Sequence, residues 1–173
     1  GWYDINLARW VSGTPQSIGG WQKFTAQAAQ GTFRTLFPWS TLNGTRFYGA
    51  GTNLKYYLVY GNSLVDITPI RSTVTINNNP FSVSVGNTTV TVTDTAHGAV
   101  VNDFVTYSGA TGPIGGVPAS DFNTEHQIIS VLSANSYTII VATTPTGTAS
   151  GGGASVVAAY QISTGTNTTV LGN

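Results

Sequence analysis

The second half of the chain alternates apolar and polar residues with a period of two. In residues 81–85 and 88–93 every second side chain is apolar, and Gly86-Asn87 between them suits a two-residue hairpin turn, because glycine tolerates positive φ. Further strand-like runs follow at residues 100–107, 127–132, 136–141 and 155–162. Strands at this spacing, with no helix between them, predict a small antiparallel β-barrel or sandwich.

The first half predicts a β-meander after an irregular opening. Residues 47–51, 54–60 and 63–68 have the pattern of three successive strands, and Gly61-Asn62 suits a type II′ turn between the last two. Such a meander is the unit of a propeller blade or of a small barrel. Residues 1–43 are rich in aromatic residues but broken by glycine and proline, so they predict an extended loop with short strands. The fold class is therefore all-β.

Two long connections interrupt the second half, at residues 109–123 and 143–153. Both are rich in glycine, proline, threonine and alanine, which predicts surface loops. Loops of this length are uncommon without a role, so they are candidate contact surfaces.

Charged residues make up only 7% of the chain, and they are unevenly spread. Residues 1–71 hold six cations and two acids, a net charge of +4, whereas residues 72–173 hold four acids and no cation, a net charge of −4. This change predicts a domain boundary. We divide the chain into a basic, aromatic-rich meander part at residues 1–75 and a barrel or sandwich module at residues 76–173. So few charges are unusual for a cytosolic enzyme.

The chain has no cysteine and no methionine. Without cysteine it has neither disulfides nor thiolate metal ligands, which fits assembly in a reducing cytoplasm. No apolar run approaches the roughly 20 residues that a transmembrane helix needs, and no signal peptide is visible. Because the chain opens at Gly1 without an initiator, we expect it to be an excised part of a longer polypeptide.

The residues that could carry catalytic or metal-binding chemistry are few. His97 precedes a glycine and predicts a turn residue, and His126 follows an acid at the start of a strand, where we expect a solvated edge position. A zinc site on the two histidines would need acids such as Asp94, Asp103 or Asp121 to converge, and no metal-ligand spacing supports it.

Paired carboxylates for glycoside cleavage would have to come from the same acids and Glu125. Asp121 and Glu125 lie four residues apart, and nothing in the sequence places them across a cleft. There is no nucleophile elbow and no glycine-rich loop with the lysine of a phosphate-binding motif. We therefore predict no catalytic residue, no cofactor and no metal site.

Cations and aromatic residues are interleaved in the first half, a pattern that can bind nucleic acid. The cations are Arg34, Arg46, Lys55 and Arg71, and the aromatic residues near them are Trp39, Phe47, Tyr48, Tyr56 and Tyr57. A net charge of +4 is modest, however, and isolated cations more often form ion pairs or lie over aromatic faces. The pattern is compatible with a passive role, such as lining a channel through which DNA passes.

Two groups of short sequence phrases resemble known phage proteins. The first group consists of Gly20-Trp21-Gln22-Lys23-Phe24, Arg34, Pro38-Trp39, Leu42, residues 51–57 (GTNLKYY) and residues 66–71 (DITPIR). It resembles the opening region of large structural tail proteins of short-tailed phages and prophages, of the nozzle or tail-tube type. The second group consists of residues 90–98 (VTVTDTAHG), 103–110 (DFVTYSGA) and 130–139 (SVLSANSYTI). It is similar to a small β-module whose shape is likened to the catalytic-cysteine-half domain of ubiquitin-activating enzymes.

This resemblance implies a structural protein of a virion tail that is assembled in the host cytoplasm. Its expected partners are copies of itself in a ring and other tail proteins. Passive contact with translocating DNA is also compatible with this role. The second module cannot perform the chemistry of ubiquitin-activating enzymes, because the chain has no cysteine. We therefore expect a role in subunit contacts without catalysis.

Two other classes of function stay open. An adhesin or carbohydrate-binding module would use exposed tryptophans to stack on sugar, and the candidates are Trp2, Trp10, Trp21 and Trp39. Burial of these side chains in a core or an interface is the competing interpretation. An enzyme would need a cleft that gathers two of Asp94, Asp103, Asp121 and Glu125.

Overall fold

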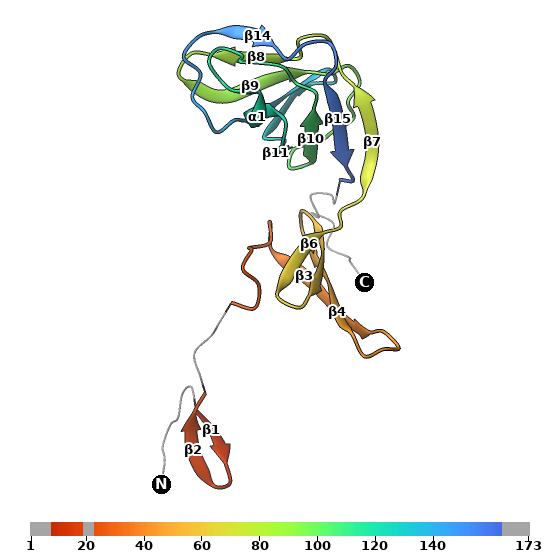
Figure 1. Ribbon diagram of the computed structural model, residues 1–173, viewed down its shortest axis with the longest axis vertical. Helices are drawn as coiled ribbons and strands as arrows, with labels where there is room; N and C mark the ends of the chain where they lie inside the picture. The colour runs from red at the N-terminus through yellow and green to blue at the C-terminus, as the bar shows by residue number, and fades with distance from the viewer. Residues whose placement is uncertain (1–7, 19–22, 164–173) are drawn as a thin grey trace.

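The protein is built almost wholly of antiparallel β-strands (Figure 1). The computed structural model describes residues 8–18 and 23–163. The prediction of an all-β fold is confirmed. Within the described residues the strands form open sheets and none closes into a barrel. This part of the chain also contains no helix with the length and hydrophobicity of a transmembrane span.

The first half contains a two-stranded hairpin and a four-stranded meander. The hairpin pairs β1 (Ala8–Val11) with β2 (Thr14–Ser17). The meander has the order β3-β4-β5-β6, with bounds Phe33–Ser40, Arg46–Thr52, Tyr56–Tyr60 and Ser63–Asp66. The three predicted strands are β4, β5 and β6. The strand β3 replaces part of the extended loop that we predicted for residues 1–43.

Two facing sheets form a sandwich in the second half. One has the order β12-β13-β9-β8-β14, with bounds Ser130–Ser133, Ser136–Ile140, Asn87–Thr93, Phe81–Ser84 and Ala149–Gly151. The other has the order β11-β10-β15-β7, with bounds Glu125–Gln127, Phe104–Ser108, Val157–Gln161 and Ile70–Thr75. Side chains from both sheets form one continuous buried cluster between them.

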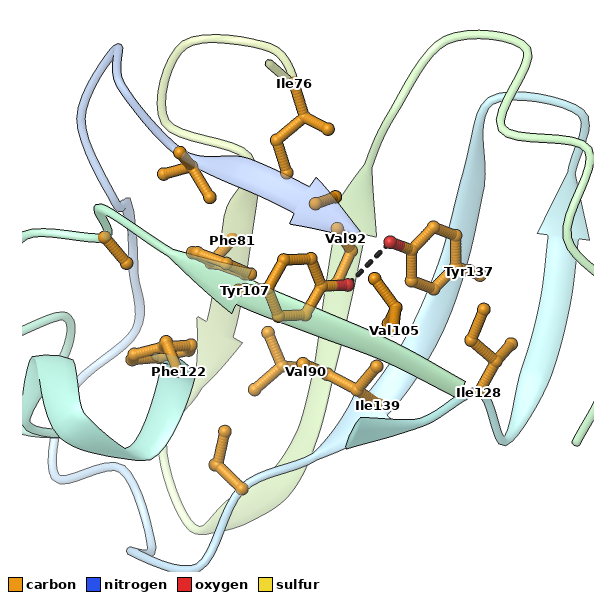
Figure 2. Close-up of a cluster of buried hydrophobic side chains, with 14 of the residues drawn as sticks. Ile76, Phe81, Val90, Val92, Val105, Tyr107, Phe122, Ile128, Tyr137 and Ile139 are labelled. Carbon is orange, nitrogen blue, oxygen red and sulfur yellow. Dashed lines mark hydrogen bonds between the residues drawn. The ribbon is translucent and has the colours of Figure 1, made fainter. Parts of the chain in front are cut away.

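The predicted alternation creates this core (Figure 2). Phe81, Val90 and Val92 are fully buried and lie on the same side of β8 and β9 as Ile139 of β13. Val85, which we also placed in this apolar row, is 61% exposed. The hairpin turn falls one residue earlier than predicted, because Ser84 pairs with Asn87 and Gly86 takes positive φ (75°) inside the loop.

Two predicted strands have different bounds in the structure. The predicted strand at residues 100–107 begins only at Phe104, because the Asp103 carboxylate accepts a hydrogen bond from the Val100 amide (3.0 Å) and closes a turn. The predicted strand at residues 127–132 is divided between the two sheets. β11 pairs with β10, whereas β12 pairs with β13, so the chain crosses the sandwich at Ile128 and Ile129.

The two long connections are not simple surface loops, and that prediction was wrong. Residues 109–123 contain the short helix α1 (Ala119–Phe122), and they bury Ile114, Val117 and Phe122 in the core. Residues 143–153 contain β14, which pairs with β8 at the edge of the first sheet. Both segments therefore close the open side of the sandwich, where apolar side chains would otherwise meet water.

One buried lysine joins the meander to the sandwich. Lys55 Nζ lies 2.6 Å from Asp66 Oδ2 in the meander and 2.6 Å from Glu125 Oε1 in the sandwich. The ammonium group also lies 4.4 Å from the centroid of the Phe104 ring. Gln161 donates a further hydrogen bond to Glu125 Oε1 (2.7 Å). The predicted division between residues 75 and 76 stays a prediction; β7, which precedes it, pairs with β15 in the sandwich.

Opposing effects set the pKa values of Lys55 and Asp66 in this joint between the meander and the sandwich. Burial alone would lower the pKa of Lys55, but the hydrogen bonds and charges of Asp66 and Glu125 outweigh it and hold the pKa above its usual 10.5. Burial alone would raise the pKa of Asp66, but hydrogen bonds from Lys55 and Thr68 hold the pKa below its usual 3.8. The ion pair is therefore present across the neutral range.

Removing the lysine leaves two carboxylates facing each other without a cation. We expect Lys55→Ala to lower the free energy of unfolding by about 2 kcal/mol, less than for a fully buried pair because both carboxylates are partly exposed. All four tryptophans lie in residues 1–39, so urea denaturation followed by tryptophan fluorescence reports on the first half. The matched control is Lys23→Ala, which removes an exposed cation and should change stability by less than about 0.5 kcal/mol.

Comparing wild type with Lys55→Ala at different pH values tests the ion pair a second way. The lowered pKa of Asp66 stabilises the fold above pH 3.8, and this contribution is lost as the pH falls through the folded-state pKa. The raised pKa of Lys55 stabilises the fold below pH 10.5, and this contribution is lost as the pH rises through the folded-state pKa. The stability difference between wild type and Lys55→Ala should therefore shrink at both extremes. A difference that is constant from pH 3 to pH 11 would contradict the ion-pair account.

Candidate functional site

The four acids of the second half lie in separate places. Each accepts hydrogen bonds from a different neighbour: Asp94 from the Tyr160 hydroxyl, Asp103 from the Val100 amide and the Ser163 hydroxyl, Asp121 from the Thr143 amide, and Glu125 from Lys55 and Gln161. Across residues 8–18 and 23–163, no three His, Cys, Asp or Glu side chains gather as metal ligands would. These acids therefore act as hydrogen-bond acceptors for the fold.

His97 occupies a turn, as its neighbouring glycine predicts. Ala96 and Gly98 on either side take positive φ (55° and 58°). The ring is buried, with Nδ1 accepting a hydrogen bond from the Ala99 amide (3.0 Å) and Nε2 lying 3.1 Å from the Ser133 carbonyl oxygen. The imidazole thus ties the turn to β12.

His126 is buried, and the prediction of a solvated edge position was wrong. Although β11 is an edge strand, the side chain points into the sandwich, where its ring centroid lies 5.8 Å from that of Tyr107. Its Nδ1 lies 3.0 Å from the Ile140 carbonyl oxygen, which binds β11 to the facing sheet. The pairing of β11 with β10 places His126 opposite Val105, a core residue, and this long-range contact has no signal in the residues adjacent to His126.

Three buried tyrosine hydroxyls form a chain that ends on Asp94. Tyr107 Oη lies 2.6 Å from Tyr137 Oη (Figure 2), which lies 2.7 Å from Tyr160 Oη, and Tyr160 donates to Asp94. Burial raises the pKa of Tyr137 to about 12, and it also raises the pKa of Tyr107 and of Tyr160. The hydroxyls therefore stay protonated at neutral pH. They satisfy one another as buried hydrogen-bonding groups and do not supply a phenolate.

A polar hollow of about 470 Å³ lies beside the three tyrosine hydroxyls. Asp94 is the one of the four acids that lines it, and its hydrogen-bond donor Tyr160 lines it too. The guanidinium of Arg71 lies 5.1 Å from the centroid of the Tyr160 ring and donates a hydrogen bond to the His97 carbonyl oxygen (3.0 Å). One cation and one acid, both used in the wall, give this hollow no net charge to attract an ionic ligand.

Strand register separates the meander into two faces of different composition. The pairs Trp39–Phe47, Phe47–Tyr60 and Leu58–Val65 lie on one face, which we call the open face. Its residues are Thr35, Phe37, Trp39, Phe47, Gly49, Gly51, Tyr56, Leu58, Tyr60, Ser63 and Val65. None carries a charge, and the exposed side chains include Phe37 at 67% and Tyr60 at 52%. This is an apolar surface open to solvent.

A row of aromatic rings crosses the open face, formed by Phe37, Trp39, Phe47 and Tyr60. The Trp39 and Phe47 ring centroids lie 5.7 Å apart at 18°, and those of Phe47 and Tyr60 lie 5.0 Å apart at 23°. Gly49 leaves room for this packing, because a Cβ there would lie 3.2 Å from the Trp39 ring. Neighbouring rings of the row are therefore packed against each other, while Phe37 and Tyr60 at its ends stay exposed to solvent.

The opposite face of the meander, which we call the covered face, is partly shielded by residues 23–30. Tyr57 and Val59 are buried there, and the Tyr57 hydroxyl accepts a hydrogen bond from the Gln30 amide (2.9 Å). The cover is incomplete. An apolar hollow of about 370 Å³ remains, lined by Phe24, Leu36, Tyr48 and Val59.

Only one of the cations that are interleaved with aromatic residues in the sequence lies beside the aromatic row. Arg46 pairs with Ser40 on the covered face, and it lines a hollow at this end of the sheet together with Trp39 and Phe47. Arg34 lies in the irregular start of β3, where the register shifts. Lys55 is buried in the joint and Arg71 lies over Tyr160, so neither extends an aromatic platform. Because alternate residues of a strand point to opposite sides, Arg46 belongs to the covered face although it is next to Phe47 in the sequence.

Two of the four candidate tryptophans can be placed. Trp10 lies in β1 and is exposed, and Trp39 lies in the aromatic row. Trp2 and Trp21 lie outside the described residues. The aromatic row itself was missed at the sequence level, although the spacing of Phe37 and Trp39 two residues apart is a usable signal for one strand face.

Similarity to known proteins is weak. No family model matches the sequence, and no curated protein matches it. Among solved structures, the phage phi92 endosialidase is similar with a TM-score of 0.43 and 17% sequence identity. The match covers 85% of this chain but only 21% of the endosialidase chain. A TM-score this low does not establish a common fold, so the likeness supports no statement about activity or substrate.

Proposed function

We propose that this chain is a structural component of a phage virion tail, of the nozzle or tail-tube type, which acts through subunit contacts and without catalysis. Its partners are copies of itself in a ring and other tail proteins, and any contact with translocating DNA is passive. The chain is assembled into the tail in the host cytoplasm.

The observation that carries this proposal is the uncharged open face of the meander. A sheet with apolar side chains on both faces is stable when both faces are covered, because exposed apolar area is costly in water. Here residues 23–30 shield part of one face, while Phe37, Trp39, Tyr56, Tyr60 and Val65 of the other are exposed. An apolar surface of this kind is typical of a protein interface.

Other features support the same role. Asp94, Asp103, Asp121 and Glu125 of the sandwich serve as hydrogen-bond acceptors for the fold. The meander has two edge strands, β3 and β6, whose outer backbone groups can pair with strands of another chain. The resemblance of residues 20–71 to short-tailed phage proteins agrees with this reading.

A glycan-binding module is the competing proposal. On the meander, Trp39 is the candidate residue for stacking on a sugar. Sugar recognition by stacking uses the flat face of an exposed ring. One face of Trp39 is already stacked on Phe47, and Phe37 lies beside it at a centroid distance of 6.2 Å. This packing favours a protein contact over a sugar platform.

The proposal is tested by locating the chain in purified particles. Virions should carry it in several copies per particle, and an antibody to the chain should label the tail in electron micrographs. The control gradient contains the chain expressed alone, which should not reach the virion density. A monomer that never sediments with virions would contradict the proposed function.

A further inference from the structure

The polar hollow of the sandwich lies between the strand β7 and the turn at residues 94–98, which together supply most of its wall. β7 is the outermost strand of its sheet (Figure 1). Arg71 of β7 and Asp94, which follows β9, bring charged groups to the hollow from the two facing sheets. The volume of about 470 Å³ is within the range of small-molecule sites.

The Asp94 carboxylate is buried, and the fold uses only one of its oxygens. The residue is 5% exposed, and its Oδ2 accepts the hydrogen bond from the Tyr160 hydroxyl. Within the described residues no hydrogen bond reaches Oδ1. A buried carboxylate oxygen without a donor is costly, so a donor that enters the hollow would be favoured.

Arg71 supplies donors to the same hollow. One of its nitrogens, Nη2, donates to the His97 carbonyl oxygen, and a guanidinium has further N–H groups. The guanidinium lies over the Tyr160 ring, whose hydroxyl holds Asp94, so one tyrosine positions both charged groups. In the part of the chain that the structure describes, Arg71 and Asp94 form no ion pair with each other. Both charged groups are therefore available to a ligand that bridges them.

Uncharged polar side chains complete the wall. None of them takes part in a hydrogen bond among the described residues, and they are Ser72, Thr75, Asn77 and Thr95. Val74 and Ala96 add small apolar areas. The hollow thus offers one strong acceptor, several donors and several groups that can act as either.

We propose that this hollow binds one sugar unit of a neutral glycan, with Asp94 accepting a hydrogen bond from one hydroxyl and Arg71 donating to a neighbouring hydroxyl. Each sugar hydroxyl is both donor and acceptor, so adjacent hydroxyls satisfy both charged groups at once. This binding goes beyond the proposed tail function and uses a site in the sandwich, separate from Trp39 of the meander.

Other ligand classes fit the wall less well. An anion would be repelled by Asp94 and a cation by Arg71, whereas an apolar ligand would leave both without partners. A single amide group bridges a donor and an acceptor, but it leaves the uncharged polar groups of the wall unused. A sugar ring carries hydroxyls in several directions, which matches the distribution of polar groups around the hollow.

Titration of the isotope-labelled full chain by nuclear magnetic resonance tests the proposal. The probes are methyl α-glucoside, methyl α-mannoside, methyl β-galactoside and N-acetylglucosamine. We expect at least one of them to shift the amide signals of residues 71–77 and 94–98 saturably, with a dissociation constant on the order of 1 mM.

Two substitutions assign the binding to the hollow. Asp94→Asn keeps the size of the side chain and an acceptor for Tyr160 but turns an amide donor toward the ligand, so binding should weaken at least about fivefold. The matched control is Asp121→Asn, an acid that also accepts a hydrogen bond but does not line the hollow, and it should bind as wild type does.

A substitution that fills the hollow leaves the Asp94 carboxylate intact. Val74→Trp should abolish binding, because the indole occupies the space of the sugar ring. Its matched control is Val85→Trp in the β8–β9 turn, outside the hollow, which should bind normally. Far-ultraviolet circular dichroism checks that all four variants are folded, and Val74→Trp decides the matter if Asp94→Asn does not fold.

Several results would overturn the proposal. They are the absence of any shift with all four sugars, shifts that lie outside residues 71–77 and 94–98, and equal binding by Val74→Trp and Val85→Trp. Tighter binding of glucuronic acid or glucosamine than of the neutral sugars overturns the assignment of a neutral ligand, and tighter binding of acetamide overturns the assignment of a sugar. A chain that is present in virion tails but binds no sugar keeps the proposed tail function and loses this site.

Discussion

A β-strand sends consecutive side chains to opposite sides, and this constraint has different consequences in the two halves of the protein. In the sandwich, Phe81, Val90 and Ile139 turn inward from one sheet and meet side chains of the other, so alternation produces a closed core. In the meander both sides of the sheet are apolar. Residues 23–30 shield only part of one side and leave the other in solvent, and this incomplete burial is the main physical reason to expect a partner.

The buried lysine links these two halves. An ammonium group removed from water needs nearby carboxylates, and Lys55 takes one from its own sheet, Asp66, and one from the sandwich, Glu125. Because Glu125 is also held by Gln161, the contact fixes a specific point of the sandwich against the meander. A face that is held in place can present its aromatic rings to a neighbour with little loss of conformational freedom.

The polar groups of the sandwich serve the fold. The hydroxyls of Tyr107, Tyr137 and Tyr160 satisfy one another inside an apolar core and end on Asp94. His97 and His126 connect a turn and an edge strand to neighbouring carbonyl groups. Such interactions favour one packing arrangement over others, since a buried polar group is costly without a partner. They agree with a component whose role is mechanical.

Sequence alone determined the all-β class, the meander strands and the alternating core of β8 and β9, because a period of two is a local property that needs no knowledge of distant residues. Only the tertiary structure decided where polar residues ended up. His126 was expected in solvent, but the pairing of β11 with β10 turns it toward the core. The partnership of Lys55 with Glu125 spans 70 positions, and the placement of Arg46 on the covered face depends on strand register. Both follow from long-range pairing, for which adjacent residues carry no signal.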